Sequence, residues 1–452
     1  MKNNYLPLLL SSIPFAGFLT VSANNDDRPN IVVIIADDLG TNELGCYGGQ
    51  NVKTPNIDRL ANEGIRLTNN YASCAMSVPI RASMYTGLYP ARHGSYQNHK
   101  KSYTNIKSIT SYMPQTGYRL ARAGKQDSMP KSVYSFEELP GFKVDCTAVD
   151  ASYTTDGIEE FVNRDNNPFC MFVCSINSHR PWTSGDPSQF DPDKLVLPPN
   201  CVDNKDVRNL FCKYLAEIGQ LDKEVGSVLK VLEDAGKLEN TLVIFLGEQG
   251  PCMPFAKWTC YNYGQHSAFI ARYPKKIAQG AVSDAIVQYE DILPTLMDFA
   301  GAAPVAGLDG FSCLPVLYGK KAEHRDWAYG IHNNIPEGTA YPIRSIRDKR
   351  YKLIWNLSPQ LDYFEQHLMK EGDQTQVWGF WLESAKTDEF AKFLTERYVR
   401  RPEFEFYDLK EDPWELNNIA NQPENAGRIA TMKTELKRWM DEQGDTGALL
   451  DK

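Results

Sequence analysis

The sequence predicts an α/β fold in which a large, mostly parallel sheet is flanked by helices and followed by a smaller α+β part. Three apolar runs, residues 31–36, 169–176 and 242–246, each lead into polar side chains, which is typical of strands buried on both faces of a parallel sheet. Residues 210–232, which precede the third run, have the apolar stripe of a long amphipathic helix. From about residue 324 the pattern changes to short strands and a polar helix. This order of strands and helices favours a doubly wound first part.

The chain opens with a segment typical of a secretory signal peptide. Lys2 precedes an apolar run from Tyr5 to Val21, and Val21, Ser22 and Ala23 are small enough for a cleavage site. We expect residues 1–23 to be this leader, with a membrane anchor as the alternative, and the protein to be exported to the periplasm or secreted. Residues 24–323 then form the main domain and residues 324–452 the smaller one. No later apolar run is long enough to span a bilayer, so stable membrane insertion is not expected.

Composition describes an ordinary globular protein with an acidic balance. The 452 residues carry a formal net charge of −9, and removal of Lys2, the one charged residue among the first 23, makes this −10. Such a body does not attract polyanions at long range, which argues against nucleic acid as a partner. An anionic substrate would need a local cationic pocket. The ten cysteines permit disulfides in an exported protein, but their spacing shows neither a metal motif nor a pairing.

A serine and an arginine lie four residues apart at the predicted start of a short helix. Pro79 is tolerated in a first helical turn, and Gly87 and Pro90 are expected to close the helix. Ser77 would then lie where free backbone N–H groups and the helix dipole favour an anion. Arg81, about one turn further, could reach the same point. The alternative is an ordinary capped helix with an exposed arginine.

Acidic and amide side chains follow two of the predicted strands. Asp37 and Asp38 come after the first strand, and Glu248 and Gln249 after the third. Because the carboxyl ends of parallel strands meet at one edge, these side chains are expected to converge there. All-oxygen ligation favours Ca²⁺ over Mg²⁺, which demands tighter octahedral geometry; a turn that favours aspartate is the alternative for the first pair. The predicted site at this edge comprises Asp37, Asp38, Ser77, Arg81, His179, Glu248 and Gln249.

Residues 77–87, S-V-P-I-R-A-S-M-Y-T-G, resemble the core motif of the sulfatase family, which reads C or S, x, P, x, R, A-S-x-x-T-G. The resemblance covers about residues 28–420 and implies an alkaline-phosphatase-like fold. In this family the cysteine or serine is oxidised to formylglycine by a maturase, so the resemblance implies that Ser77 is the modified residue. Ile80 departs from the small residue that is usual at its position.

The resemblance also implies a calcium site. Family members place a D-D pair after the first strand and a D-N pair after a later one, and these pairs bind calcium together with the modified residue. Asp37 and Asp38 match the first pair. Glu248 and Gln249 replace the second with one extra methylene each, which preserves the ligand chemistry and alters the reach.

Three further positions match family residues that contact the sulfate or the leaving group. Gly124 and Lys125 resemble the G-K-x-H element, whose lysine contacts the sulfate, but the histidine position is Asp127, which leaves that role vacant or changed. Lys257 falls where the family has a sulfate-binding Lys or Arg; a solvated surface lysine is the alternative. His179, in S-H-R-P-W, matches the histidine that faces the leaving group, a task that suits a pKa near 6.5. A structural histidine at a strand end is the alternative.

The carboxyl-terminal part predicts an antiparallel sheet with a covering helix. Residues 341–347 and 351–356 flank an Arg-Asp-Lys turn and indicate a hairpin, residues 404–409 are strand-like, and residues 424–443 form a polar amphipathic helix. Within the family, residues 341–354 and the aromatic-rich stretch 380–407 look most like the sulfamidases, which remove N-linked sulfate from glucosamine in heparan fragments. His99 and Arg344 are candidates for lining the sugar pocket, with plain surface residues as an equal alternative.

Together these features predict hydrolysis of a sulfate group on a carbohydrate. A hydrated aldehyde has two hydroxyls, so one can attack sulfur and the other can later lose its proton to expel sulfate without attack by water at sulfur. Arg81, Lys125 and Lys257 would stabilise charge on the sulfuryl oxygens, and His179 would protonate the departing atom. The alternatives are an O-sulfatase on another glycosaminoglycan or host glycan, a phosphate or phosphonate ester hydrolase, and a sulfated-glycan-binding protein with unmodified Ser77.

Overall fold

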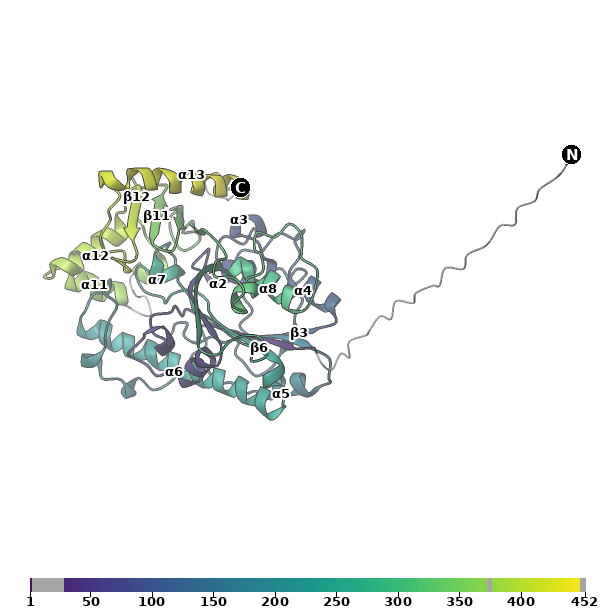
Figure 1. The fold of residues 1–452 in the computed structure, drawn as a ribbon. Helices are drawn as coiled ribbons and strands as arrows, with labels where there is room; N and C mark the ends of the chain where they lie inside the picture. Colours follow the sequence, from purple (N-terminus) through teal and green to yellow (C-terminus); the bar gives the residue numbers. More distant parts are fainter. Residues whose placement is uncertain (2–27, 371, 373–375, 448–452) are drawn as a thin grey trace.

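The computed structural model describes Met1, residues 28–370, Gly372 and residues 376–447 of the chain. It contains an eight-stranded sheet with helices on both faces and a separate four-stranded sheet (Figure 1). The predicted leader over residues 1–23 lies, apart from Met1, outside the described residues. Within the described ranges, no helix combines the length and the apolar character needed to cross a bilayer.

The large sheet is mixed and mostly parallel, as predicted. Its strand order is β4-β3-β5-β1-β6-β7-β2-β8, and β7 runs antiparallel to both of its neighbours. The three predicted apolar runs form adjacent central strands whose residues are all buried: β5 (Phe169–Cys174), β1 (Asn30–Ala36) and β6 (Thr241–Gly247). The other strands are β2 (Ile65–Tyr71), β3 (Arg119–Gly124), β4 (Glu137–Leu139), β7 (Phe269–Arg272) and β8 (Ala281–Gln288).

Side chains of β1 alternate between two apolar clusters, one on each face of the sheet. Val32 and Ile34 belong to one cluster, and Val33 and Ile35 to the other, as the two-residue period of a strand requires. Figure 1 shows α6 (Lys205–Asp234) and α5 (Asp156–Asn163) on one side of the sheet, and α2 (Ser77–Thr86) and α8 (Ile292–Phe299) on the other. Apart from their first residues, Asn30 in β1 and Thr241 in β6, the central strands are apolar, which suits strands that are covered on both faces.

The predicted long helix is α6, which extends beyond the predicted limits at both ends. It begins at Lys205 because the side chain of Asn204 accepts a hydrogen bond from the backbone N–H of Val207. The shorter helices are α1 (Pro55–Asn62), α3 (Pro90–His93), α4 (Ile109–Tyr112), α7 (Asn262–Gln265), α9 (Leu314–Leu317) and α10 (Gln366–Met369). Single 3₁₀ turns are η2 (Gly45–Tyr47), η3 (Met113–Thr116), η4 (Pro187–Gln189), η5 (Pro192–Lys194), η6 (Leu238–Asn240), η7 (Tyr289–Asp291) and η8 (Pro423–Asn425).

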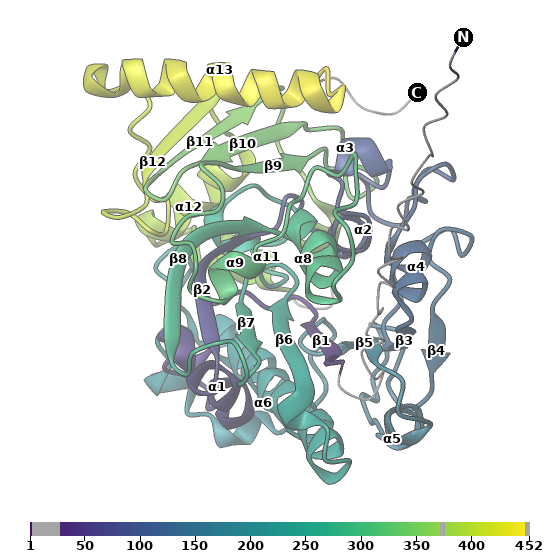
Figure 2. The ribbon, with the colours of Figure 1, turned by 45° about the vertical axis from the view of Figure 1, so that its right-hand side comes forward.

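The second sheet confirms the predicted antiparallel hairpin. Its order is β12-β11-β10-β9, from strands β9 (Ala328–His332), β10 (Ile343–Arg347), β11 (Tyr351–Asn356) and β12 (Phe404–Asp408). Helix α13 (Ala426–Gln443) lies across this sheet (Figure 2), and α11 (Val377–Ser384) and α12 (Glu389–Val399) precede β12. Trp439 of α13 stacks on Tyr329 of β9 with ring centroids 4.8 Å apart. One apolar cluster contains side chains of both sheets, so the two parts share a core.

The cysteines take no part in cross-linking. All ten fall in the described part of the chain, and none is in a disulfide. Cys170 and Cys174 are fully buried in β5.

Candidate active site

Backbone hydrogen bonds hold the residues that follow neighbouring strands at one edge of the large sheet. The N–H of Glu248 donates to the carbonyl of Ala36 at 3.0 Å, and the N–H of Lys125 donates to that of Cys174 at 2.9 Å. The strand ladders therefore continue past the strand ends, and the side chains of Asp37, Glu248 and Lys125 meet there. This is the predicted convergence of strand ends.

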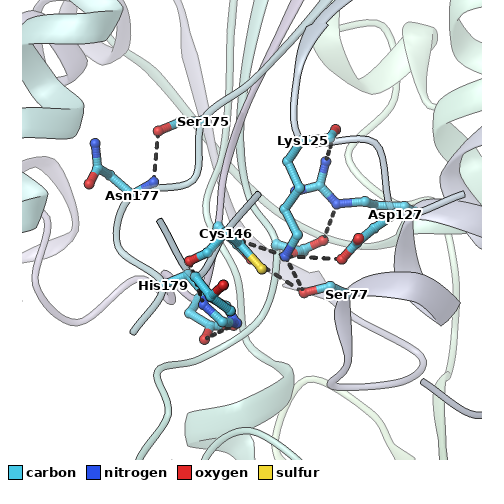
Figure 3. A network of polar contacts seen from close by, with 12 residues as sticks. Ser77, Lys125, Asp127, Cys146, Ser175, Asn177 and His179 are labelled. Carbon is cyan, nitrogen blue, oxygen red and sulfur yellow. Dashed lines mark hydrogen bonds and ion pairs between the residues drawn. The ribbon is translucent and has the colours of Figure 1, made fainter. Parts of the chain in front are cut away.

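Ser77 is the first residue of α2, as predicted from Pro79 in the first turn. Gly87 ends the helix with a left-handed φ of +67°, which suits glycine, whereas Pro90 starts the next helix. The Ser77 hydroxyl oxygen lies 2.9 Å from Glu248 Oε2, to which it donates, and accepts a hydrogen bond from Lys125 Nζ at 3.1 Å. Figure 3 shows the Lys125 ammonium between Ser77 and Asp127.

Three buried carboxylates form a compact cluster beside Ser77. One oxygen from each of Asp37, Asp38 and Glu248 lies within 4.8 Å of the others, and all three side chains are buried. Each carboxylate has one cationic partner. The partner atoms are Lys125 Nζ with Asp37 Oδ2 at 2.6 Å, Lys257 Nζ with Asp38 Oδ1 at 2.8 Å, and Arg81 Nε with Glu248 Oε1 at 2.5 Å. The charges balance pairwise in the interior, where an unpaired charge would be strongly destabilising.

The two carboxyls nearest Ser77 have pKa values that are shifted in opposite directions. Burial would raise the pKa of Asp37, but the charges of Lys125, His179 and Arg81 outweigh it and hold that pKa well below its ordinary value. Burial, together with the negative charge of Asp37, raises the pKa of Glu248 to about 8 despite the adjacent Arg81. Glu248 is therefore the carboxyl that binds a proton more readily, and Asp37 stays ionised.

Gln249 completes a set of oxygen donors. Its amide nitrogen donates to Asp38 Oδ1 at 2.6 Å, and its amide oxygen is buried without a hydrogen-bond partner among the described residues. A buried acceptor without a donor is costly, and a cation would satisfy it. With the three carboxylates and the Ser77 oxygen, the donor chemistry fits a hard divalent cation such as Ca²⁺. The extra methylenes of Glu248 and Gln249 thus leave both side chains within the cluster.

A pocket of about 320 Å³ opens above Ser77. Its wall is drawn from segments that are far apart in the chain. The lining residues are Ser77, Asn98, His99, Lys125, Asp127, Cys146, Thr147, His179, Arg180, Lys257, Trp258, Gln366, His367 and Gly372. A volume of this size accommodates a small ligand such as a monosaccharide derivative.

His179 lies on the loop after β5 and faces this pocket. Its Nδ1 lies 2.5 Å from the carbonyl oxygen of Arg180 and 3.2 Å from that of Cys146, so Nδ1 carries the hydrogen and donates. Burial, followed by the charge of Lys257, lowers the pKa of His179 to about 4. The ring is therefore neutral near pH 7, and Nε2, 3.8 Å from Asp38 Oδ2, has a lone pair for proton exchange.

Glu224 of α6 holds the start of this loop. Ser175 Oγ and Asn177 Nδ2 donate to its two carboxylate oxygens at 2.5 and 2.7 Å. Figure 3 shows Ser175 and Asn177 on the segment that leads to His179. This contact between α6 and the site was not predicted, because Asn177 and Glu224 are 47 positions apart in the chain.

Asp127 occupies the position where the family motif has histidine. Its carboxylate lies 3.1 Å from Lys125 Nζ, and its backbone has a positive φ of 31°. Burial would raise its pKa, but the charges of Lys125 and Arg81 lower it below the ordinary value. The position therefore carries a second anionic partner for Lys125.

The structure brings together all nine residues predicted as catalytic or metal-ligating. Of the two predicted sugar-pocket residues, His99 lines the pocket and Arg344 does not. Arg344 lies on β10 with 0% exposure, and its guanidinium Nη2 contacts Asp445 Oδ1 at 2.9 Å and its Nη1 contacts Asn333 Oδ1 at 2.9 Å. This corrects its predicted placement, because a guanidinium enclosed by these partners is not available to a ligand.

Apart from Asp127, eight pocket-lining residues were not predicted, namely Asn98, Cys146, Thr147, Arg180, Trp258, Gln366, His367 and Gly372. Asn98, Arg180 and Trp258 each adjoin a predicted residue in the chain, so a wider window around the motifs would have included them. His367 has no such signal. It reaches the site because α10 packs beside Trp258, with the two rings stacked at 5.3 Å.

A hydroxyl at a helix start, three buried cations and a cluster of oxygen donors are features of a site that hydrolyses anionic esters. The family model described as Sulfatase matches residues 29–302, and the one described as N-sulphoglucosamine sulphohydrolase, C-terminal, matches residues 250–375. The chain belongs to the sulfatase family of enzymes.

Curated relatives match over most of their length. An ulvan-active sulfatase of Formosa agariphila is 32% identical over 434 residues, which cover 94% of this chain and 83% of that protein. The human N-sulphoglucosamine sulphohydrolase is 25% identical over 477 residues, covering 92% and 91%. An N-acetylglucosamine-6-O-sulfatase of Bacteroides thetaiotaomicron is 26% identical over 533 residues, covering 94% and 89%.

Solved structures confirm the predicted alkaline-phosphatase-like fold. A protein in complex with its substrate D-glucosamine-2-N,6-O-disulfate superposes with a TM-score of 0.71 at 24% identity, covering 94% of this chain and 100% of that chain. The phosphonate monoester hydrolase of Silicibacter pomeroyi superposes with a TM-score of 0.69 at 16% identity, covering 93% and 97%. At these identities the likeness concerns the fold alone.

Proposed function

We propose that this protein is an exported, calcium-dependent sulfatase that removes sulfate from a sulfated carbohydrate, with N-sulfated glucosamine of heparin or heparan fragments as the first substrate to test. The observation that carries the proposal is the position of the Ser77 hydroxyl at the start of α2, 3.1 Å from Lys125 Nζ and beside the oxygen-donor cluster. The match of residues 250–375 to the sulphohydrolase carboxyl-terminal model supports the choice of N-sulfated glucosamine. The 32% identical ulvan-active sulfatase supports an O-sulfated glycan as the alternative.

Two groups that the sulfatase family implies fit the residues at this edge. Ser77, once oxidised to formylglycine by a maturase, would supply an aldehyde hydrate whose two hydroxyls permit attack at sulfur and later release of sulfate. Asp37, Asp38, Glu248, Gln249 and the residue 77 oxygen would hold Ca²⁺, which would supply positive charge beside that position.

The side chains of the pocket divide the remaining work. Lys125 and Lys257 line the pocket and Arg81 lies behind Ser77, so three cations can offset the charge that develops on the sulfuryl oxygens. The pKa of Lys125 is held well above its ordinary value, because the charges of Asp127 and Asp37 outweigh the effect of burial. His179 would first accept a proton from solvent at Nε2, because its Nδ1 hydrogen is held by backbone carbonyls, and would then donate this proton to the departing nitrogen or oxygen.

Export is part of the proposal. The charged start, apolar run and small residues before position 24 support it. Amino-terminal sequencing of the protein recovered from the periplasm or medium should then begin at residue 24. A retained leader in that fraction would favour an anchor.

The function is tested with protein made in a host that contains a serine-modifying maturase. Intact-mass analysis of the peptide with Ser77 should show a loss of about 2 mass units, which reports oxidation of the alcohol to the aldehyde. The same preparation is then assayed on D-glucosamine N-sulfate, on O-sulfated mono- and disaccharides including ulvan fragments, and on 4-nitrophenyl sulfate and phosphate.

Each outcome separates the proposal from its rivals. Hydrolysis of sulfated sugars by the matured protein, and none by the Ser77→Ala variant, supports the sulfatase. Faster hydrolysis of the aryl phosphate than of any sulfate would identify a phosphoester hydrolase instead. An unchanged Ser77 mass with binding but no hydrolysis of sulfated sugars would identify a binding protein.

A further inference from the structure

Beside the pocket lie buried polar atoms that have no hydrogen-bond partner among the described residues. Glu337, on the segment between β9 and β10, is 1% exposed, and neither of its carboxylate oxygens accepts a hydrogen bond. Asn98 Oδ1 and Trp258 Nε1, on two pocket-lining residues, are also buried and unpaired. Buried polar groups without partners are destabilising, so unpaired atoms beside a pocket indicate a partner that arrives from the pocket.

Glu337 is joined to the pocket wall from two directions. The backbone N–H of Gln366 donates to its carbonyl oxygen at 2.8 Å, and the Asn98 side chain lies beside its carboxylate without the alignment of a full hydrogen bond. Gln366 and Asn98 both line the pocket. Burial raises the pKa of Glu337 to about 7, and the charge of Lys257 opposes that rise.

The chemistry of this cluster differs from that of the sulfate site. A carboxylate would repel the sulfate, and Lys257, the cation whose charge acts on Glu337, is paired with Asp38 at 2.8 Å. The unpaired atoms are mostly acceptors: two oxygens of Glu337 and one of Asn98, against the single indole N–H of Trp258. A ligand that matches these four atoms is neutral, donates hydrogen bonds to the three oxygens and accepts one from the indole N–H. The hydroxyls of a sugar ring are such groups.

We propose that Glu337, together with Asn98, accepts hydrogen bonds from hydroxyls of the sugar ring whose sulfate lies at Ser77, and thereby selects a saccharide over other sulfate esters. Trp258 contributes its indole N–H to the same ring. The inference rests on the proposed sulfatase function and adds the residues that recognise the sugar. Glu337 is a specificity residue in this scheme, because it stands apart from the atoms that react.

The first test compares two substrates on matured wild type and on Glu337→Gln. D-Glucosamine N-sulfate has ring hydroxyls, whereas 4-nitrophenyl sulfate has none. We expect the ratio of kcat/KM for the sugar to that for the aryl sulfate to fall about tenfold or more in Glu337→Gln, mainly through KM, since hydrogen bonds to charged groups are the stronger ones. An unchanged ratio would overturn the assignment.

Glu43→Gln is the matched control. Glu43 is buried, has one unpaired carboxylate oxygen and a pKa raised by burial to about 7, and contacts Tyr263 rather than the pocket. Its substitution should leave the substrate ratio at the wild-type value. If thermal unfolding shows that Glu337→Gln is not folded, Asn98→Ala takes its place, because Asn98 is at a partly exposed position. Asn98→Ala should show the same selective loss of kcat/KM for the sugar.

A binding measurement separates this inference from the hydrolase proposal. Titration calorimetry with D-glucosamine N-sulfate compares Ser77→Ala with Ser77→Ala/Glu337→Gln, and we expect about tenfold weaker binding by the double variant. Weaker binding by the double variant supports the sugar contact even if matured wild type hydrolyses neither substrate, which would reject only the hydrolase. If matured wild type hydrolyses both substrates, but Ser77→Ala and the double variant bind the sugar equally and Glu337→Gln keeps the wild-type ratio of kcat/KM, only the sugar contact is rejected. Absence of binding by Ser77→Ala would reject the sugar contact.

Discussion

Replacing Lys257 by methionine tests whether the buried ammonium holds the acidic cluster and competes with a cation for it. Lys257 is 3% exposed, and its Nζ lies 2.8 Å from Asp38 Oδ1 and 2.9 Å from Oδ2. At an effective dielectric constant of about 20, unit charges at this distance attract by about 6 kcal/mol, which desolvation of the ammonium offsets in part. Removing one partner of such a pair costs about 3–5 kcal/mol of unfolding free energy, because the other charge stays buried.

The assay is thermal unfolding, first with a chelator and then with added calcium. An unfolding entropy of about 2.1 cal/mol/K per residue makes 1 kcal/mol worth about 1 °C in a chain of 452 residues, so the chelated variant should melt about 3–5 °C below wild type. Calcium should raise the Tm of Lys257→Met more than that of wild type, because the ion no longer displaces an ammonium from Asp38.

Lys352→Met is the matched control for this experiment. Lys352 forms an equally buried pair with Glu415 Oε1 at 3.1 Å, outside the active site. Its loss should cost comparable stability while the calcium-dependent rise in Tm stays at the wild-type value. Equal calcium responses in wild type and Lys257→Met would refute the competition between lysine and cation. No calcium response in either protein would refute the assignment of Asp38 as a ligand.

Three further predictions follow from buried groups. Burial lowers the pKa of His93 to about 3, whereas the ring in the unfolded chain binds a proton below about pH 6.5. In urea titrations, the unfolding free energy of wild type should therefore fall, relative to that of His93→Gln, by about 1.4 kcal/mol for each unit that the pH is lowered between 6.5 and 4. Arg344→Met should lower the unfolding free energy by about 3–5 kcal/mol because it leaves Asp445 unpaired, and the double variant Arg344→Met/Asp445→Leu should recover most of this loss. The KM for a sulfated sugar should not change in Arg344→Met. A raised KM would restore the predicted sugar contact. Glu224→Ala should lower kcat about tenfold or more with little change in KM, because the loop that carries His179 loses its hydrogen bonds to Glu224. Glu224→Gln should recover part of kcat. A wild-type kcat in Glu224→Ala would exclude this positioning role.

Much of the large sheet and the core of the site could be predicted from short stretches of sequence. A continuous β-branched run such as residues 31–36 has few stable alternatives to a strand buried on both faces, and both faces of β1 are indeed covered. Pro79 in a first turn and Gly87 at a left-handed position mark the limits of α2 within one residue or two. These features depend on interactions between residues that are close in the chain, which local patterns report directly.

Pairings between distant residues were decided by the tertiary structure. Asp38 and Lys257 are 219 positions apart, and Arg344 and Asp445 are 101 apart, so no local pattern could show that Lys257 pairs with Asp38 or that Arg344 pairs with Asp445 in the core. The place of Glu337 beside Asn98 likewise depends on how the second sheet packs against the first. Periodicity and motifs thus determined which residues form strands, helix starts and strand-end clusters. Strand order, register and the packing of the two sheets selected the partner of each buried charge, because a buried charge is paired with whichever group the packing places within a few ångströms.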